Sequence, residues 1–134
     1  MAASRSALIL LVEDDVRSAR VLARMLVEDG FQVELVRDGA AAIARLSAPP
    51  LPGLLCTDLQ LPHAGGVAVA RYGRSLDPDL PVILTTGYPE QATGIEKEMH
   101  PPPVVLTKPF DYRVLRREIQ ALLDLPVGRF SFVP

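Results

Sequence analysis

Cysteine, histidine and long apolar runs are all scarce in this sequence, which has one cysteine, Cys56, and two histidines. A single cysteine excludes an internal disulfide and a cysteine-rich zinc site, and its place in an apolar run predicts a core side chain. The longest uninterrupted apolar run, residues 7–12, is far shorter than the roughly 20 residues that a membrane-spanning helix needs. Because the flanks of this run also lack a signal-peptide pattern, we expect a cytoplasmic protein without membrane insertion.

Neither sign of charge dominates the chain. Lysine and arginine together number 14 against 16 aspartates and glutamates, and the net charge is −2 at pH 7. The arginines are scattered along the sequence, so no basic patch is predicted and direct nucleic-acid binding is not expected. Only Lys97 and Lys108 are lysines, so a lysine within a motif carries more information here than in most sequences.

The length and composition fit one globular domain. With 134 residues, of which 49% are hydrophobic and 22% charged, the chain can bury roughly two-thirds of the surface that its unfolded form exposes. No internal repeat or low-complexity linker appears. We therefore predict a single domain over residues 1–125, followed by a C-terminal tail over residues 126–134.

Apolar runs rich in valine, leucine and isoleucine alternate with stretches of helical periodicity, which is typical of a parallel sheet flanked by helices. The expected strands are residues 8–12, 31–36, 54–57, 82–85 and 104–106. The expected helices are residues 16–27, 39–46, 67–76, 91–99 and 112–123, with Asp15, Asp38 and Asp111 as capping residues. The helix over residues 91–99 must be short, because prolines and glycines surround it.

Polar side chains stand where four of these strands end. In open sheets of this kind the carboxyl ends of the strands meet at one rim because the strands are parallel, and ligands bind at that rim. The first strand ends in an acidic run, and the third, fourth and fifth strands end at an aspartate, a threonine pair and a lysine. The candidate site residues are therefore Glu13, Asp14, Asp58, Thr86 and Lys108.

The carboxylates at this rim predict a metal site. If the first and third strands are neighbours, Glu13, Asp14 and Asp58 crowd together, and each pair about 5 Å apart repels by roughly 3 kcal/mol. Oxygen ligands on a shallow rim suit Mg²⁺, which keeps several waters and binds phosphate oxygens readily. Zinc would require histidine or cysteine ligands, which are missing from these positions.

The motifs LLVEDD, CTDLQLP, VILTTG and LTKPF follow one another along the chain. Together with a glycine after the second motif, they contain the residues Glu13, Asp14, Asp58, Pro62, Gly66, Thr86 and Lys108. In this order they resemble the receiver domain of response regulators in two-component signal transduction, over residues 8–123. The resemblance implies a doubly wound α/β fold of the flavodoxin-like type, with five parallel strands in the order 2-1-3-4-5 and helices on both faces.

The resemblance also implies a role for each site residue. Asp58 accepts a phosphoryl group, Thr86 donates a hydrogen bond to it, and Lys108 screens its charge and precedes a cis proline bond. Mg²⁺, which Mn²⁺ can replace, is bound by Asp14, Asp58 and the backbone carbonyl of Gln60, while Glu13 acts largely through water. Arrival of the phosphoryl group biases a two-state rearrangement of the nearby loops.

In this family the phosphoryl donor is a histidine kinase or a histidine phosphotransfer domain, and phosphorylation can bring about a dimer. The protein is then a signalling switch rather than a metabolic enzyme, although it catalyses its own phosphorylation and slowly loses the phosphoryl group. The run LTTGYPE looks like receivers that are attached to hybrid histidine kinases. Val105 departs from the family pattern, which commonly has an aromatic residue there, so we expect the response to involve residues 88–99 instead.

Three other functions remain open from the sequence. A Mg²⁺-dependent phosphohydrolase can use an aspartyl nucleophile on a similar sheet, but such enzymes usually add a substrate cap for which this chain leaves no room. An interaction module that is never phosphorylated has no need for the complete set of site residues. A nucleotide-binding protein of flavodoxin type is expected to have a glycine-rich loop after its first strand, and the sequence has none there.

Overall fold

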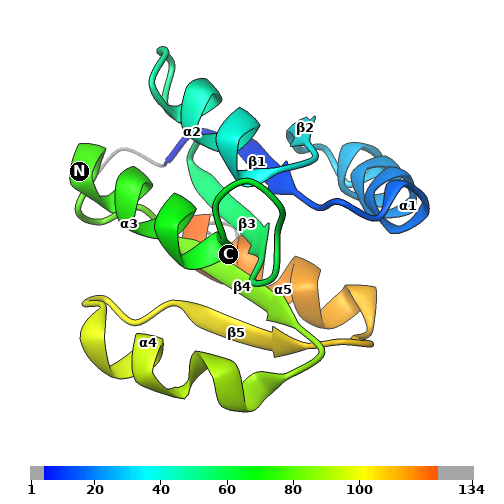
Figure 1. Ribbon diagram of the computed structural model, residues 1–134. Coiled ribbons are helices and arrows are strands. Elements are labelled where there is room, and N and C mark those ends of the chain that lie inside the picture. The colour runs from blue at the N-terminus through cyan, green and yellow to red at the C-terminus, as the bar shows by residue number, and fades with distance from the viewer. Residues whose placement is uncertain (1–4, 124–134) are drawn as a thin grey trace, which may run out of the picture.

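The computed structural model of the protein describes residues 5–123 and contains a five-stranded sheet. Its strands are β1 (Leu8–Val12), β2 (Gln32–Val36), β3 (Leu54–Asp58), β4 (Val82–Thr86) and β5 (Val104–Thr107). They lie in the order β2-β1-β3-β4-β5, and every neighbouring pair is parallel (Figure 1). The expected fold class and strand order are therefore confirmed, whereas the predicted domain end at residue 125 and the tail over residues 126–134 lie outside the described residues.

Helices connect the strands and cover both faces of the sheet. They are α1 (Val16–Glu28), α2 (Gly39–Leu46), α3 (Gly66–Leu76), α4 (Thr93–Glu98) and α5 (Tyr112–Leu123). Helices α1 and α5 lie on one face, and α2, α3 and α4 lie on the other (Figure 1). No helix described between residues 5 and 123 is long and apolar enough to cross a membrane.

Most predicted bounds are right to within one residue, and the largest difference concerns residues 91–99. A 3₁₀ turn, η1 (Pro89–Ala92), precedes α4, which has only six residues and no side-chain cap. Proline is tolerated in the first turn of a helix, where no intrahelical partner for its missing N–H is needed, so the helical segment starts two residues earlier than predicted. The expected short helix is nevertheless confirmed.

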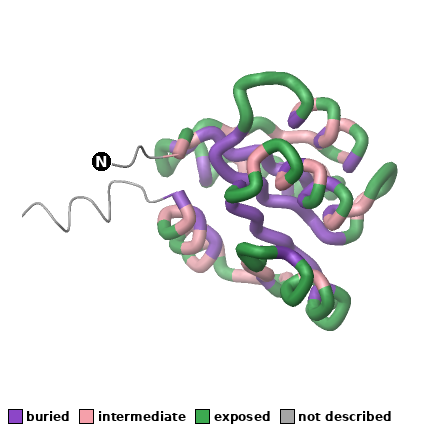
Figure 2. The backbone as a smooth tube through the Cα atoms, turned by 90° about the vertical axis from the view of Figure 1, so that its left-hand side faces the viewer, coloured by how far each residue is buried: buried purple, intermediate pink, exposed green. Residues whose placement is uncertain are grey.

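Two apolar layers fill the space between the sheet and its helices. Side chains alternate along each strand, so in β1 Leu10 and Val12 pack under α2 and α3, while Ile9 and Leu11 pack under α1 and α5. Figure 2 shows the buried chain segments running through the centre, with exposed residues on the outer sides of the helices. Burial on both faces explains why β1 and the first residues of β3 and β4 read as apolar runs, whereas the edge strand β2 alternates with polar residues. Cys56 is buried in this core, as predicted.

Aspartates begin three of the helices, as the sequence predicts. The side chains of Asp15 and Asp38 each accept a hydrogen bond from the backbone N–H three residues later. Asp111 accepts one from the N–H two residues later, at 2.8 Å. Each of these bonds satisfies an N–H group that would otherwise lack a partner at the helix start. The cap at Asp15 fixes the turn between β1 and α1, where Glu13 and Asp14 stand.

The loop between β3 and α3 passes very close to the end of β3. A Cβ atom on Gly66 would lie 2.1 Å from the carbonyl oxygen of Asp58, far inside contact distance. The N–H of Gly66 donates to the carbonyl of Leu59 at 3.0 Å, which closes the loop directly after Asp58. Glycine at position 66 therefore allows the backbone path that surrounds Asp58.

We expect Gly66→Ala to lower the free energy of unfolding by about 1–3 kcal/mol, the usual cost of forcing extra volume into a packed site. The matched control is Gly65→Ser, because a Cβ atom there would meet no atom closer than 3.6 Å and serine is a favoured N-cap residue for α3. Urea denaturation measures both variants. An equal loss in both, or no loss in Gly66→Ala, would contradict the steric argument.

Candidate functional site

The C-terminal ends of β1, β3, β4 and β5 meet at one edge of the sheet and bring the predicted residues together. Asp58 and Thr86 are the last residues of β3 and β4. Glu13 directly follows β1, and Lys108 directly follows β5. The N–H of Lys108 donates to the carbonyl of Thr86 at 2.7 Å, which ties the last two strand ends together. The rim that the sequence predicts is thus present in the structure.

Three carboxylates form an acidic cluster at this rim. One oxygen from each of Glu13, Asp14 and Asp58 lies within 4.8 Å of the other two. Glu13 and Asp58 are buried, with 6% and 7% of their surface exposed, whereas Asp14 is exposed. Each pair of charges repels by roughly 3 kcal/mol at a separation of about 5 Å and an effective dielectric of about 20. The cluster is therefore unfavourable unless positive charge lies beside it.

Lys108 supplies part of that positive charge. Its Nζ lies 2.8 Å from Oε1 of Glu13 and 3.1 Å from Oδ1 of Asp58, so one ammonium group bridges the two buried carboxylates. The peptide bond from Lys108 to Pro109 is cis, as the resemblance implies. One ammonium against three carboxylates still leaves the cluster short of positive charge.

The pKa values of these groups reflect that shortage. Burial and the nearby charge of Glu13 raise the pKa of Asp58 to about 6, against the opposing effect of Lys108. Burial also acts on Glu13, but its hydrogen bonds with Lys108 and with the N–H of Asp15 outweigh it and hold its pKa below the ordinary value. Burial alone would lower the pKa of Lys108, yet its contacts with both carboxylates outweigh it and raise that pKa. Of the two buried carboxylates, Asp58 is therefore the one whose charged form a further cation would stabilise more.

The donor atoms of the cluster fit a hard divalent cation. All of them are carboxylate oxygens, and no histidine or cysteine within residues 5–123 joins the group. His63 and His100 are exposed. Oxygen donors that are partly open to water suit ions such as Mg²⁺ and Mn²⁺, which keep several water ligands. The excess of negative charge in the cluster also favours binding of a divalent cation.

We expect Mg²⁺ to raise the melting temperature of the unphosphorylated protein. At about ten times its Kd, a ligand that binds only the folded state stabilises it by roughly 1.4 kcal/mol, which corresponds to several degrees for a domain of this size. Differential scanning fluorimetry in chelator and in millimolar Mg²⁺ measures the shift. Asp14→Asn should lose most of it, whereas Asp15→Asn should keep it, because Asp15 caps α1 and is not part of the acidic cluster. Equal shifts in the two variants would contradict the assignment.

The hydroxyl of Thr86 is buried, and both of its hydrogen-bonding roles are filled. It donates to Oε1 of Gln60 at 3.1 Å and accepts the N–H of Tyr88 at 2.9 Å. The side-chain amide of Gln60 in turn donates to Oε1 of Gln91 at 2.6 Å. The family resemblance assigns Gln60 a metal-binding role through its backbone carbonyl, and nothing in the sequence pointed to Gln91 as a site residue. No sequence pattern pairs two glutamines that are 31 positions apart.

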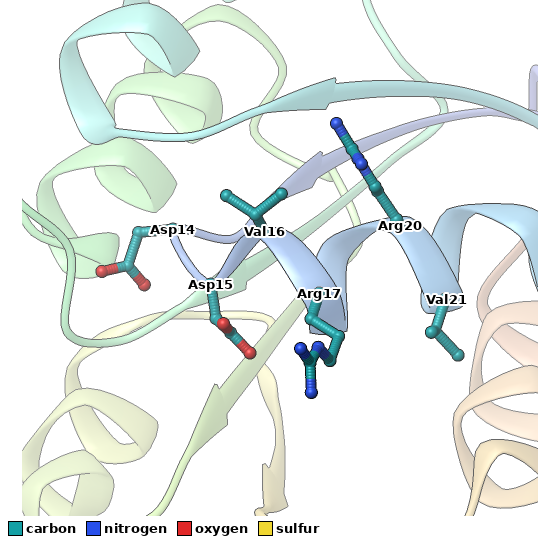
Figure 3. Close-up of a pocket in the computed structure, with 6 residues that line it drawn as sticks. All are labelled: Asp14, Asp15, Val16, Arg17, Arg20 and Val21. Atoms are coloured by element: carbon teal, nitrogen blue, oxygen red, sulfur yellow. The ribbon is translucent and has the colours of Figure 1, made fainter.

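Two open hollows flank the start of α1 beside the acidic cluster. Figure 3 shows the first, lined by Asp14, Asp15, Val16, Arg17, Arg20 and Val21, with the two arginines projecting to opposite sides of the helix. The second lies between α1 and the loop after β5, and Val21, Leu22, Lys108 and Phe110 are among its lining residues. Val21 is 55% exposed. The rim can therefore be approached from the side of α1.

The response regulator receiver domain family matches residues 9–120 of the chain. The chain is 36% identical over 115 residues to the response regulator receiver protein CpdR of Brucella abortus, a match that covers 86% of this chain and 95% of that protein. Its fold is similar to that of a response regulator receiver protein from Sinorhizobium medicae, with a TM-score of 0.81, 26% identity, and 89% and 95% of the two chains covered. It is also similar to the signal receiver domain of a signal transduction histidine kinase from Syntrophus aciditrophicus, with a TM-score of 0.75, 31% identity and 91% of each chain covered. The chain belongs to the family of response regulator receiver domains, the signalling switches of two-component systems.

Proposed function

We propose that the protein accepts a phosphoryl group on Asp58, with a divalent cation beside it, and changes conformation in response. The observation that carries this proposal is the position of the Asp58 carboxylate. It belongs both to the acidic cluster and to the ion pair with Lys108, at the rim where Thr86 ends the neighbouring strand. Such a carboxylate has the counter-charges that attack on an anionic phosphoryl donor requires.

The transfer exchanges one bond to phosphorus for another. An Oδ atom of Asp58 attacks the phosphorus of a phosphohistidine, the phosphorus–nitrogen bond breaks, and the imidazole leaves and takes up a proton from water. Lys108, at 3.1 Å, screens both the Asp58 carboxylate and the incoming phosphoryl oxygens. A bound Mg²⁺ or Mn²⁺ ion supplies further neutralisation of these two anions. The chain thus promotes its own phosphorylation.

We assign the metal ligands to Asp14, Asp58 and the backbone carbonyl of Gln60, with Glu13 acting through water. Glu13 holds Lys108 at 2.8 Å and accepts the N–H of Asp15 at 3.1 Å, which supports an indirect role. Among the backbone hydrogen bonds of residues 5–123, none that lies outside the helices and strands ends on the Gln60 carbonyl. That oxygen is therefore able to bind a cation.

We assign the response to Thr86 and to the segment that follows it. A phosphoryl group on Asp58 offers strong acceptor oxygens to the Thr86 hydroxyl and an ion pair to Lys108. Val105 replaces the usual aromatic residue and is only partly buried against the apolar layer under α2 and α3. The short η1 and α4 elements bury little surface of their own, so residues 88–99 are the segment that we expect to shift.

The proposed donor is a histidine kinase or a histidine phosphotransfer domain in the cytoplasm. The hollows beside α1 support this, because they give a macromolecule access to the rim next to Arg17, Arg20 and Val21. The likeness to a histidine kinase receiver agrees with the interpretation of LTTGYPE as a run from hybrid kinases. Slow loss of the phosphoryl group and dimer formation on phosphorylation stay predictions from the family resemblance.

Incubation with acetyl phosphate and Mg²⁺ tests the proposed function. We expect mass spectrometry to show one added phosphoryl group per chain, and we expect hydroxylamine to remove it, because an acyl phosphate reacts with that nucleophile. A chain that stays unlabelled with acetyl phosphate and with candidate kinases would instead be an interaction module. Repeated release of phosphate from small phosphate esters would point to a phosphohydrolase.

A further inference from the structure

A chain of three hydrogen bonds links the end of β4 to the start of the η1 turn. The Thr86 hydroxyl donates to Gln60, and the side-chain amide of Gln60 donates to Gln91. Gln91 is the third residue of η1, and its own N–H donates to the carbonyl of Tyr88 at 2.9 Å. The two glutamines thus connect the β3–α3 loop, the end of β4 and the segment that leads to α4.

A threonine hydroxyl has one proton to donate, and in this structure that proton is used. Thr86 gives it to Oε1 of Gln60 while the lone pairs of its oxygen accept the N–H of Tyr88. A phosphoryl group on Asp58 needs the same proton, because its oxygens are acceptors only. Gln60 and the phosphoryl group therefore compete for a single donor, and only one of them can have it at a time.

Gln91 determines how strongly Gln60 competes. A free glutamine side chain at an exposed position samples several rotamers and points its carbonyl at Thr86 for only part of the time. The bond to Gln91 at 2.6 Å holds the carboxamide plane, so that the nitrogen faces Gln91 and the oxygen faces Thr86. Gln91 is thus a positioning residue that acts through Gln60.

We propose that Gln60 and Gln91 form a carboxamide latch that withholds the Thr86 hydroxyl from the phosphoryl site until phosphorylation opens it. The inference rests on the proposed function of Asp58 and deepens it. Opening the latch frees Gln91 and with it the N-terminal end of the η1–α4 segment. The other end stays attached to α3, because Arg71 pairs with Glu98 at 2.7 Å and Arg74 donates to the carbonyl of Pro101 at 2.8 Å. Movement is therefore concentrated next to Tyr88 and Gln91.

The latch predicts that Gln91→Met activates the site. The substitution keeps the length of the side chain but removes the acceptor, so Gln60 holds Thr86 less firmly. With beryllofluoride and Mg²⁺ as the phosphoryl mimic, calorimetry of the full chain should show an apparent affinity about threefold to tenfold higher than in wild type, the range expected for one lost hydrogen bond. Gln91→Glu keeps an acceptor for the Gln60 amide and should stay at or below the wild-type affinity.

Three controls separate the latch from a general structural effect. Gln32→Met, the same change at an exposed position in β2, should leave the affinity for beryllofluoride unchanged. Mn²⁺ affinity without beryllofluoride should be the same in Gln91→Met and wild type, because Gln91 is not part of the acidic cluster. The double variant Gln60→Met/Gln91→Met should bind no more tightly than Gln60→Met alone, since both changes break one chain of bonds.

The side-chain amide resonances of Gln60 report on the latch directly. In ¹⁵N-resolved spectra of the ligand-free protein they should shift in Gln91→Met and stay close to wild type in Gln91→Glu. Saturating beryllofluoride should cause a similar shift in wild type. If wild type binds beryllofluoride and Gln91→Met binds it equally well, the latch is overturned while the proposed function stands. If wild type binds no beryllofluoride at all, the proposed function fails first and the competition fails with it.

Discussion

Asp58→Asn is expected to abolish phosphorylation by acetyl phosphate. The amide has nearly the shape of the carboxylate but carries no charge and is a very weak nucleophile, so no acyl phosphate can form. Mass spectrometry after incubation with Mg²⁺ should show the unmodified mass. Full labelling of this variant would mean that another carboxylate is the acceptor, and Asp14 would be the first alternative, because its oxygen lies in the same cluster.

Asp15→Asn is the control for this experiment. Asp15 is an exposed neighbour whose carboxylate serves α1 as a cap, so its loss should weaken the helix start without removing the label. Asp14→Asn should label more slowly, because it loses one proposed metal ligand but keeps the acceptor. The order of labelling rates is therefore Asp15→Asn above Asp14→Asn, with Asp58→Asn at zero.

The same Asp58→Asn variant should be more stable than wild type when no metal is present. Burial and the charge of Glu13 raise the pKa of Asp58 from 3.8 to about 6, so the folded protein binds this proton more tightly than the unfolded chain does. The Asp58 carboxyl therefore contributes stability that increases as the pH falls from about 6 to about 4 and is lost as the pH rises. Urea denaturation in chelator should show the variant ahead by roughly 1–3 kcal/mol near pH 7, and the gap should close near pH 4.

The parts of the fold that the sequence predicts well depend on local pattern. β1 is an unbroken apolar run, and β3 and β4 begin with apolar runs, because both faces of these strands are buried. The aspartates that cap α1, α2 and α5 mark the helix starts. The site residues were predictable for a related reason. The strand ends of a parallel sheet meet at one rim, so residues far apart in the sequence could be placed together without knowledge of any side-chain conformation.

The side-chain network above the rim could not be predicted in this way. The bond from Gln60 to Gln91 depends on the rotamers of two exposed glutamines and on the path of η1, and neither leaves a periodic signal in the sequence. The same holds for the unequal pKa values of Glu13 and Asp58, which follow from small differences in contact with Lys108 and with the backbone. The sequence pattern therefore predicts where the site lies, whereas the charges and pKa values of the site can be derived only from the side-chain positions in the structure.

Lys108→Met is expected to destabilise the metal-free protein and to uncouple phosphorylation from the response. The ammonium bridges Glu13 and Asp58 at 2.8 and 3.1 Å, and its removal leaves two buried carboxylates without a counter-charge. Breaking a fully buried pair costs about 3–5 kcal/mol, and because Lys108 is 33% exposed we expect about 1–3 kcal/mol here. Urea denaturation in chelator measures this loss.

Mg²⁺ should recover more stability in Lys108→Met than in wild type, because the variant has one positive charge fewer at the cluster before the ion binds. Labelling by acetyl phosphate should persist at a reduced rate, but the change in backbone amide shifts over residues 88–99 that accompanies it in wild type should be lost. Lys108→Arg keeps the positive charge on a side chain of different length and shape. It should therefore come closer to wild type in metal-free stability than in the response of residues 88–99. An unaltered response in Lys108→Met would contradict the role that we assign to the lysine in the response.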